Sequence, residues 1–133
     1  MRVLPDVVHA PDLQVLLPAN LDRLKGKQVE GAADLVVEVV SPGSERVDRV
    51  VKFAEYEKGG VPEYWVIDWN YREALFFVRS DEGVYERKAP DTDGYYHSVV
   101  LPKLRLEVNL LWRETLPGIR EALALVEAMV SEA

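Results

Sequence analysis

The chain has no cysteine and only two histidines, and these absences exclude several kinds of site. Without cysteine there is no disulfide framework, no thiolate zinc site and no cysteine nucleophile. Two histidines, His9 and His97, are too few for a histidine-rich metal centre, and neither has the serine or carboxylate spacing of a catalytic triad. The sequence also lacks a phosphate-binding loop and a dinucleotide-binding glycine motif. The chemistry must therefore be sought among carboxylates and lysines.

Long hydrophobic runs and an excess of positive charge are also missing. No apolar run approaches the roughly 18 residues of a membrane span, and the N-terminus lacks a signal-peptide layout. We therefore expect a cytoplasmic protein with no membrane partner. The net charge of −7 argues against broad, non-specific nucleic-acid binding, which needs clustered Lys and Arg. Basic residues in the segments 23–27 and 46–58 either form a local basic face or lie on a solvated surface.

The length of 133 residues and the 48% hydrophobic content predict one ordered domain over residues 1–133. Many Glu and Arg with few Asn and Gln favour a thermophilic source. The apolar patterns predict an α/β fold in which a strand, a helix and a second strand form a parallel crossover unit. The expected elements are two short strands before residue 17, a helical turn at 20–26 capped by Asn20, strands at 34–40, 62–68, 73–79, 84–88, 98–101 and 104–111, and helices at 45–58 and 117–131.

Glu38 is the most informative residue, because it lies inside the apolar, β-branched run Asp34–Val40. Both faces of this strand are largely apolar, so we expect a central strand that is covered on both sides. An unpaired buried charge costs several kcal/mol or more, so the Glu38 carboxylate must be paired, protonated or bound to a cation. Asp34 lies on the same face about 13 Å away, and it is interpreted as a polar residue that opens the strand.

The helix that follows this strand carries the nearest lysine. Its predicted apolar arc consists of Val47, Val50, Val51, Phe53 and Ala54, with Ser44 as the N-cap and Gly59-Gly60 at the end. Along the edge of this arc, the i, i+4, i+8 spacing forms a ridge of Asp48, Lys52 and Tyr56. Lys52 can reach over the sheet to a site, or it can pair with Asp48 in solvent.

Asp12 and Glu38 form a candidate metal-binding pair. Mg²⁺ prefers carboxylate oxygens and keeps several waters, so two acids on neighbouring strands are able to hold it. The alternatives are that Asp12 is a turn aspartate after Pro11 and that Glu38 forms a structural pair with Lys52 or an arginine. The aromatic residues that either stack on nucleobases or pack in the core are Tyr64, Trp65 and Trp69.

Four segments together resemble one known family. They are Pro11-Asp12, the run Asp34–Pro42, the ridge of Asp48, Lys52 and Tyr56, and the run Gly60–Asp68. This pattern is similar to the Uma two family of restriction-endonuclease-like proteins, which belongs to the PD-(D/E)XK superfamily. The resemblance extends from about Val3 to near Leu111.

The resemblance implies a restriction-endonuclease-like core, with a central mixed β-sheet flanked by helices. It also implies hydrolysis of DNA phosphodiester bonds with Mg²⁺ or Mn²⁺. Asp12 and Glu38 would be the catalytic acids and metal ligands, and Lys52 the catalytic lysine. Val40 occupies the position of the superfamily's usual lysine. Asp48 and Tyr56 would support Lys52.

One departure from the family pattern suggests a second function. Family members usually begin with a further helix and hairpin, so the resemblance implies an N-terminally shortened domain with an appended helix at about 117–131. The alternative to a nuclease is therefore a truncated, catalytically inactive relative that acts as a dimeric binding or regulatory module. With either function we expect a homodimer.

Overall fold

The computed structural model describes residues 1–41, 46–115 and 117–130. The chain forms two compact units, Met1–Lys88 and Ala89–Ala133. The expectation of a single domain over residues 1–133 stays a prediction, because the division into two compact units does not decide whether they fold as one domain. Within the described residues, no helix is both long enough and apolar enough to cross a membrane.

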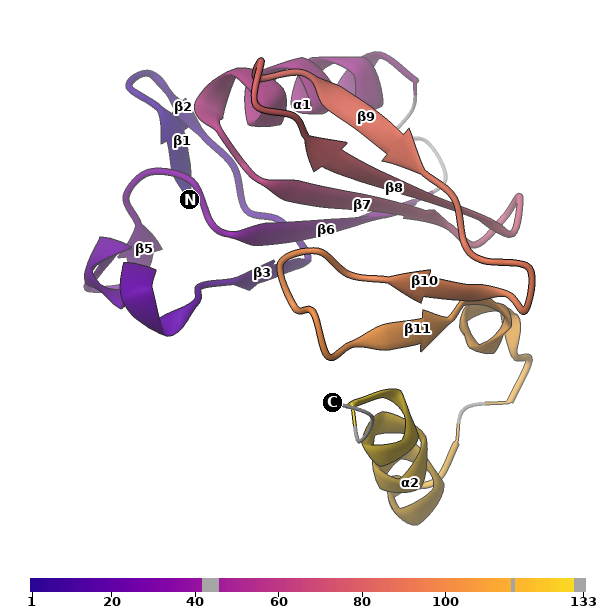
Figure 1. The fold of residues 1–133 in the computed structure, drawn as a ribbon. Coiled ribbons are helices and arrows are strands. Elements are labelled where there is room, and N and C mark those ends of the chain that lie inside the picture. The colour runs from indigo at the N-terminus through magenta and orange to yellow at the C-terminus, as the bar shows by residue number, and fades with distance from the viewer. Residues whose placement is uncertain (42–45, 116, 131–133) are drawn as a thin grey trace. The chain divides into compact units, whose positions relative to one another are not determined.

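The first unit is built on a five-stranded mixed sheet (Figure 1). In spatial order its strands are β3 Leu13–Val15, β6 Leu35–Val40, β7 Glu63–Asp68, β8 Glu73–Arg79 and β9 Tyr85–Lys88. β6 and β7 are parallel, and the other neighbouring pairs in this sheet are antiparallel. The predicted α/β fold with a mixed sheet is therefore confirmed, together with the hairpin that follows the crossover unit.

β6 and β7 each carry an acidic residue near the carboxyl end of the strand, on the same side of the sheet. β7 is buried along its whole length, and β6 is buried as far as Glu38. The parallel register pairs Glu38 with Val66 and Val40 with Asp68. Because side chains alternate between the faces of a strand, Glu38 and Asp68 project from the same face. Both lie near the carboxyl ends of their strands.

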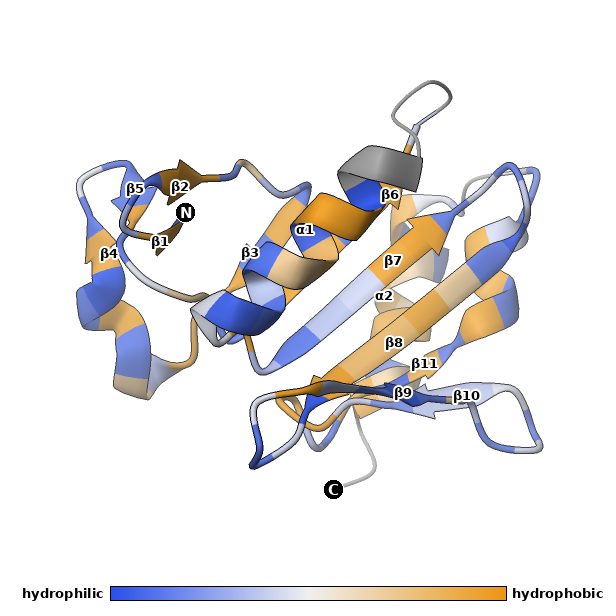
Figure 2. Cartoon of the chain, turned by 90° about the horizontal axis from the view of Figure 1, so that it is seen from above, coloured by the Kyte–Doolittle hydropathy of each residue, from blue (hydrophilic) through white to orange (hydrophobic). Residues whose placement is uncertain are grey.

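Helix α1, Arg46–Gly59, connects β6 to β7 along one face of the sheet (Figure 1), and from above it lies in front of the strands (Figure 2). Gly60 has a φ of 87°, which favours glycine, so the predicted end of the helix is confirmed. Gly59 has no space for a side chain, because a Cβ there would come within 2.6 Å of Val3 O. The predicted Ser44 cap lies outside the described residues.

The face that α1 turns toward the sheet differs from the predicted one. Phe53 and Tyr56 contribute to the core, whereas Val50 is 64% exposed and Val51 45% exposed. Ala54 is also exposed, so the apolar arc is wrong at these three positions. Aromatic side chains bury more apolar area than valines, which favours turning Phe53 and Tyr56 inward. The side chain of Val47 lies outside the described part of the chain.

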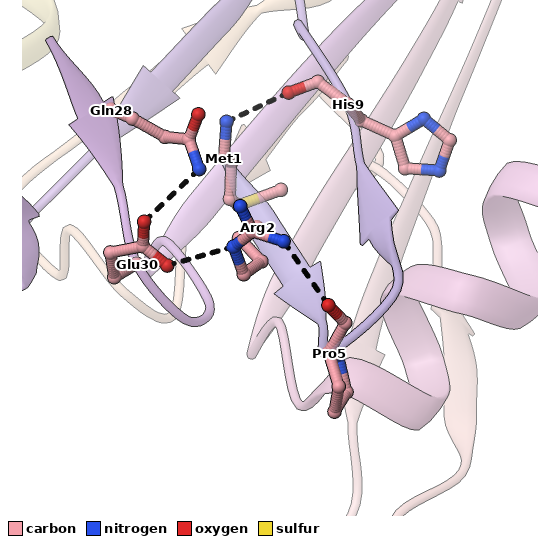
Figure 3. Close-up of polar contacts among 6 residues, drawn as sticks. All are labelled: Met1, Arg2, Pro5, His9, Gln28 and Glu30. Carbon is pink, nitrogen blue, oxygen red and sulfur yellow. Dashed lines mark hydrogen bonds and ion pairs between the residues drawn. The ribbon is translucent and has the colours of Figure 1, made fainter.

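Two small hairpins and a 3-10 helix precede β6. The hairpins pair β1 Arg2–Leu4 with β2 Val7–Val8 and β4 Leu24–Lys25 with β5 Gln28–Val29, and the 3-10 helix η1 is Pro18–Arg23. The Met1 ammonium donates to His9 O at 2.8 Å, and Arg2 pairs with Glu30 at 3.1 Å. Figure 3 shows both contacts. Burial lowers the pKa of this ammonium. Met1 and Val3 therefore anchor the start of the chain in the core.

Asn20 has a different role from the predicted one. It lies inside η1, and its side-chain amide donates to Asp34 Oδ1 at 2.8 Å. The backbone N–H of Leu17 donates to the other oxygen of Asp34 at 2.8 Å. The predicted Asn20 helix cap is therefore wrong, because the buried Asp34 carboxylate takes its amide. The interpretation of Asp34 as a polar residue that opens the strand is confirmed.

The second unit contains a short hairpin and a helix. β10 Tyr95–His97 pairs with β11 Arg105–Glu107, and the 3-10 helix η2 Val108–Trp112 and the helix α2 Ile119–Val130 follow. The expected strand at 98–101 is wrong, because the Ser98 hydroxyl accepts a hydrogen bond from Leu101 N and closes a turn there. The extended segment at 104–111 is a strand only over β11. The predicted final helix is confirmed over Ile119–Val130, and residue 131 lies outside the described residues.

Candidate active site

Glu38 forms an ion pair with Lys52 at the carboxyl end of β6. The Glu38 residue is 7% exposed, and its Oε2 lies 2.6 Å from Lys52 Nζ. This is the length of a strong, charge-assisted hydrogen bond. The requirement that a buried carboxylate have a partner is therefore met by a cation from the following helix.

Lys52 reaches the sheet from α1. Its side chain is 25% exposed, so the aliphatic part covers protein surface while the ammonium meets Glu38. Sequence reasoning left open whether this lysine reaches over the sheet or pairs with Asp48, and the structure places it on Glu38. The side chain of Asp48 lies outside the described residues.

Asp12 is held at the same end of β6 by a backbone hydrogen bond. Its Oδ2 accepts from Val39 N at 2.7 Å, and Asp12 immediately precedes β3. The antiparallel register pairs Leu13 with Val37, so one further step along the ladder places Asp12 opposite Glu38. The exposed Asp12 carboxylate therefore binds the residue next to Glu38, and the predicted metal-binding pair of the two acids stays a prediction.

The donor set fits a cation that retains water ligands. Among the described residues, no group of three or more His, Cys, Asp or Glu side chains is arranged to hold a metal ion. Mg²⁺ commonly binds through one or two carboxylates, with water or substrate phosphate completing its octahedral shell. Asp12 and Glu38 would be the two carboxylates of such a site; in the structure, one oxygen of Asp12 accepts from Val39 N and one oxygen of Glu38 accepts from Lys52.

A second cation from α1 faces the neighbouring strand, and sequence reasoning missed it. Arg49 lies 3.8 Å from the buried Asp68 at the end of β7 and 3.9 Å from Glu73 at the start of β8. Asp68 also accepts a hydrogen bond from Tyr71 N at 3.2 Å. Two features of the sequence could have indicated this contact: Arg49 lies three residues before Lys52 on the same helix, and Asp68 is the last residue of the next strand. The two cations thus pair with acids on two adjacent parallel strands.

The remaining candidate residues are distributed between the core and the surface. Tyr56 is fully buried, and its ring contacts the rings of His9 and Tyr64 at centroid distances of 5.2 and 5.0 Å. Its expected support of Lys52 stays a prediction. Tyr64 and Trp65 are buried, whereas Trp69 is 50% exposed.

The mixed sheet with α1 along one face defines an α/β protein of the restriction-endonuclease-like class. The model of the Uma2 family, described as "Putative restriction endonuclease", matches residues 2–109. The chain belongs to this family, which confirms the resemblance seen in the sequence.

A solved structure, described as a "putative nuclease belonging to DUF820" from Anabaena variabilis ATCC 29413, has the same fold. Its TM-score is 0.60 at 18% sequence identity, and the match covers 78% of this chain and 59% of that one. The chain therefore spans less than two thirds of that protein's length. Among curated proteins, none matches.

Proposed function

We propose that this protein is a metal-dependent endonuclease that hydrolyses phosphodiester bonds in DNA. Asp12 and Glu38 hold Mg²⁺ or Mn²⁺, and Lys52 is the catalytic lysine. The observation that carries the proposal is the 2.6 Å contact between the Lys52 ammonium and the buried Glu38 carboxylate. Asp12, which immediately precedes the neighbouring strand β3, lies one ladder step beyond the Leu13–Val37 pair. Membership of a family described as "Putative restriction endonuclease" supports the reaction class.

Each residue's part in hydrolysis follows from its position. When bound, a divalent cation lowers the pKa of a water and offsets charge on the phosphate. Glu38 is buried and fixed by Lys52, so its carboxylate is held in one orientation. Lys52 donates hydrogen bonds to the attacking water or to the phosphate oxygens as their negative charge grows. Asp48 and Tyr56, one turn before and after Lys52 on the helix, are its proposed positioning residues.

Metal uptake and cleavage test the proposal separately. We expect calorimetry to detect Mn²⁺ binding by the wild type and not by Glu38→Ala. Cleavage of plasmid DNA should require Mg²⁺ or Mn²⁺ and should be lost in Lys52→Ala. Lys58→Ala is the matched control, because Lys58 is an exposed lysine on the same helix. Equal cleavage by wild type and Lys52→Ala would identify a contaminating nuclease and contradict the proposal.

The alternative function is a catalytically inactive relative that acts as a dimeric binding or regulatory module. It is favoured by α2, whose apolar side chains are exposed, with Ile119 at 81%, Leu123 at 59% and Val126 at 54%. With either function we propose a homodimer that pairs through this helix. Sedimentation should show a dimer that Leu123→Glu dissociates and the neighbouring exposed control Ala124→Glu does not. A monomeric wild type would contradict the dimer.

A further inference from the structure

A larger pocket adjoins the candidate active site between α1, β7 and β8. Its volume is about 340 Å³, and it is lined by Arg49, Val50, Phe53, Tyr64, Val66, Leu75 and Phe77. Three of these residues, Arg49, Tyr64 and Val66, also line the small pocket that contains Glu38 and Lys52. The two pockets therefore share a wall, and the larger one is adjacent to the pocket that Glu38 lines.

The wall of the larger pocket is mainly apolar and aromatic. The rings of Phe53 and Phe77 meet edge to face at a centroid distance of 5.0 Å, and Tyr64 stacks with Phe77 at 6.1 Å. The exposed Val50 lies at its margin on α1. Tyr64 is buried, so the partly exposed rings of Phe53 and Phe77 provide the surface that a ligand would contact. Such a surface favours a flat, weakly polar group, and aromatic side chains bind nucleobases of any sequence in this way.

Arg49 is the charged member of the wall. Its side chain is 32% exposed, and the contacts with Asp68 and Glu73 at 3.8 and 3.9 Å are longer than hydrogen bonds. A guanidinium carries five N–H donors that match the geometry of a phosphate. Arg49 precedes Lys52 by three residues, which is about 4.5 Å along the helix axis. A phosphate at Arg49 is therefore next to the group bound at Lys52.

We propose that this pocket receives one unstacked nucleobase of the substrate while Arg49 binds the adjoining phosphate. The inference rests on the proposed nuclease function, and it specifies single-stranded or locally unpaired nucleic acid as the substrate class. The volume is at the small end of the roughly 300–1,000 Å³ range of ligand pockets, which suits one nucleotide and not a stacked base pair. The net charge of −7 makes stacking the stronger source of affinity, because stacking does not depend on a basic surface.

Two adjacent valines provide a matched test. Val50 lines the pocket and Val51 does not, yet both are exposed on α1, so glutamate at either position adds the same charge without disturbing the core. The probe is a fluorescein-labelled single-stranded oligothymidylate, titrated without added metal and followed by fluorescence anisotropy. A second oligonucleotide contains one abasic residue, and a third is the intact duplex.

We expect Val50→Glu to weaken binding of the single strand at least about fivefold, the lower end of what one stacked base contributes. Val51→Glu should leave the affinity within about twofold, and the abasic residue should weaken binding by the wild type more than by Val50→Glu. Equal affinities of the two variants, or preference of the wild type for the intact duplex, would overturn the inference. If Lys52-dependent cleavage persists in that case, only the pocket assignment fails; if the wild type neither binds Mn²⁺ nor cleaves, the proposed function itself fails.

Discussion

The two ends of β6 both bury an acidic side chain, but the hydrogen-bond donors that satisfy these acids differ in kind. At the start of the strand, Asp34 accepts hydrogen bonds from a backbone N–H and from the amide of Asn20. At the carboxyl end, Glu38 meets the ammonium of Lys52. The donors of Asp34 are neutral groups, a backbone N–H and a side-chain amide, whereas the donor of Glu38 is a charged group on a long side chain from the next helix.

The difference separates a structural acid from one suited to chemistry. The donors of Asp34 fix the path of the chain into β6, so their loss should cost mainly stability. The lysine bound to Glu38 has a long, partly exposed side chain, so in the proposed function its ammonium moves to a phosphate while a metal ion takes the carboxylate. A buried acid with a cationic partner at the end of a parallel strand is therefore the better candidate for a functional group.

The largest expected effect is on activity at the functional end of β6. Glu38→Gln should lower DNA cleavage by at least about 100-fold, because it removes the proposed metal ligand while preserving the shape of the side chain. Single-turnover cleavage assays provide the measurement, with Glu86→Gln, an exposed acid on β9, as the control. Retained cleavage in Glu38→Gln would remove the distinction between the two acids.

The next effect is on stability at the opposite end of β6. Asp34→Ala should lower the free energy of unfolding by about 2–3 kcal/mol, because it leaves the Leu17 N–H and the Asn20 amide without their acceptor. Urea denaturation measures the loss, and the exposed Asp22→Ala should change stability by less than about 0.5 kcal/mol. The cleavage rate of folded Asp34→Ala should match that of the wild type. A stable but inactive variant would reverse the roles of the two acids.

A smaller effect should appear when the cation at Glu38 is removed. Lys52→Met should raise Mn²⁺ affinity, because the metal no longer has to displace the ammonium from the buried Glu38 carboxylate. The same substitution should abolish cleavage, so metal binding and activity change in opposite directions. Calorimetry on wild type, Lys52→Met and the control Lys58→Met measures this separation. Weaker Mn²⁺ binding by Lys52→Met would show that the lysine does not compete for the carboxylate.

The smallest effect concerns an exposed pair in the second unit, Asp91 and His97. Their side chains are 2.8 Å apart, and the hydrogen bond from His97, followed by that from Tyr95 N, lowers the pKa of Asp91. Because the folded-state pKa is depressed, the stabilisation is present above the unfolded pKa and is lost as pH falls through the folded value. His97→Ala should raise the Asp91 pKa toward its ordinary value, as measured by the carboxyl carbon-13 shift during an acid titration. An unchanged titration would show that the backbone donors alone set the pKa.

The strongly patterned middle of the chain could be predicted from the sequence. The run Leu35–Val40, the segment Glu63–Asp68 and the following hairpin combine β-branched or aromatic content with clear turn residues. The partner of Glu38 was also within reach, because a buried carboxylate restricts the possible neighbours to a small set. In both cases the local sequence pattern was sufficient for a correct prediction, because no tertiary contact changed the structure that the pattern favours.

The errors arose where tertiary contacts override the local pattern. Counting apolar residues on α1 gave Val50 and Val51 the inner face, but the aromatic Phe53 and Tyr56 occupy it. The Arg49–Asp68 contact was missed because the rest of α1 and nearly all of β7 separate the two residues along the chain, and only the packing of α1 on the sheet brings them together. A single sequence indicates which buried charged side chains need a partner, but the strand register and helix packing determine which residue that partner is.

The close approach of Val3 to Gly59 has a consequence for the distant lysine. Gly59 is seven residues, or about 10.5 Å along the axis, beyond Lys52 on the same helix. Because the backbone of the first strand lies against the side of the helix at Gly59, a larger residue there would push the helix away from that strand. A methyl group added at position 59 would therefore shift α1, and with it the charge that meets Glu38, without touching either member of the ion pair.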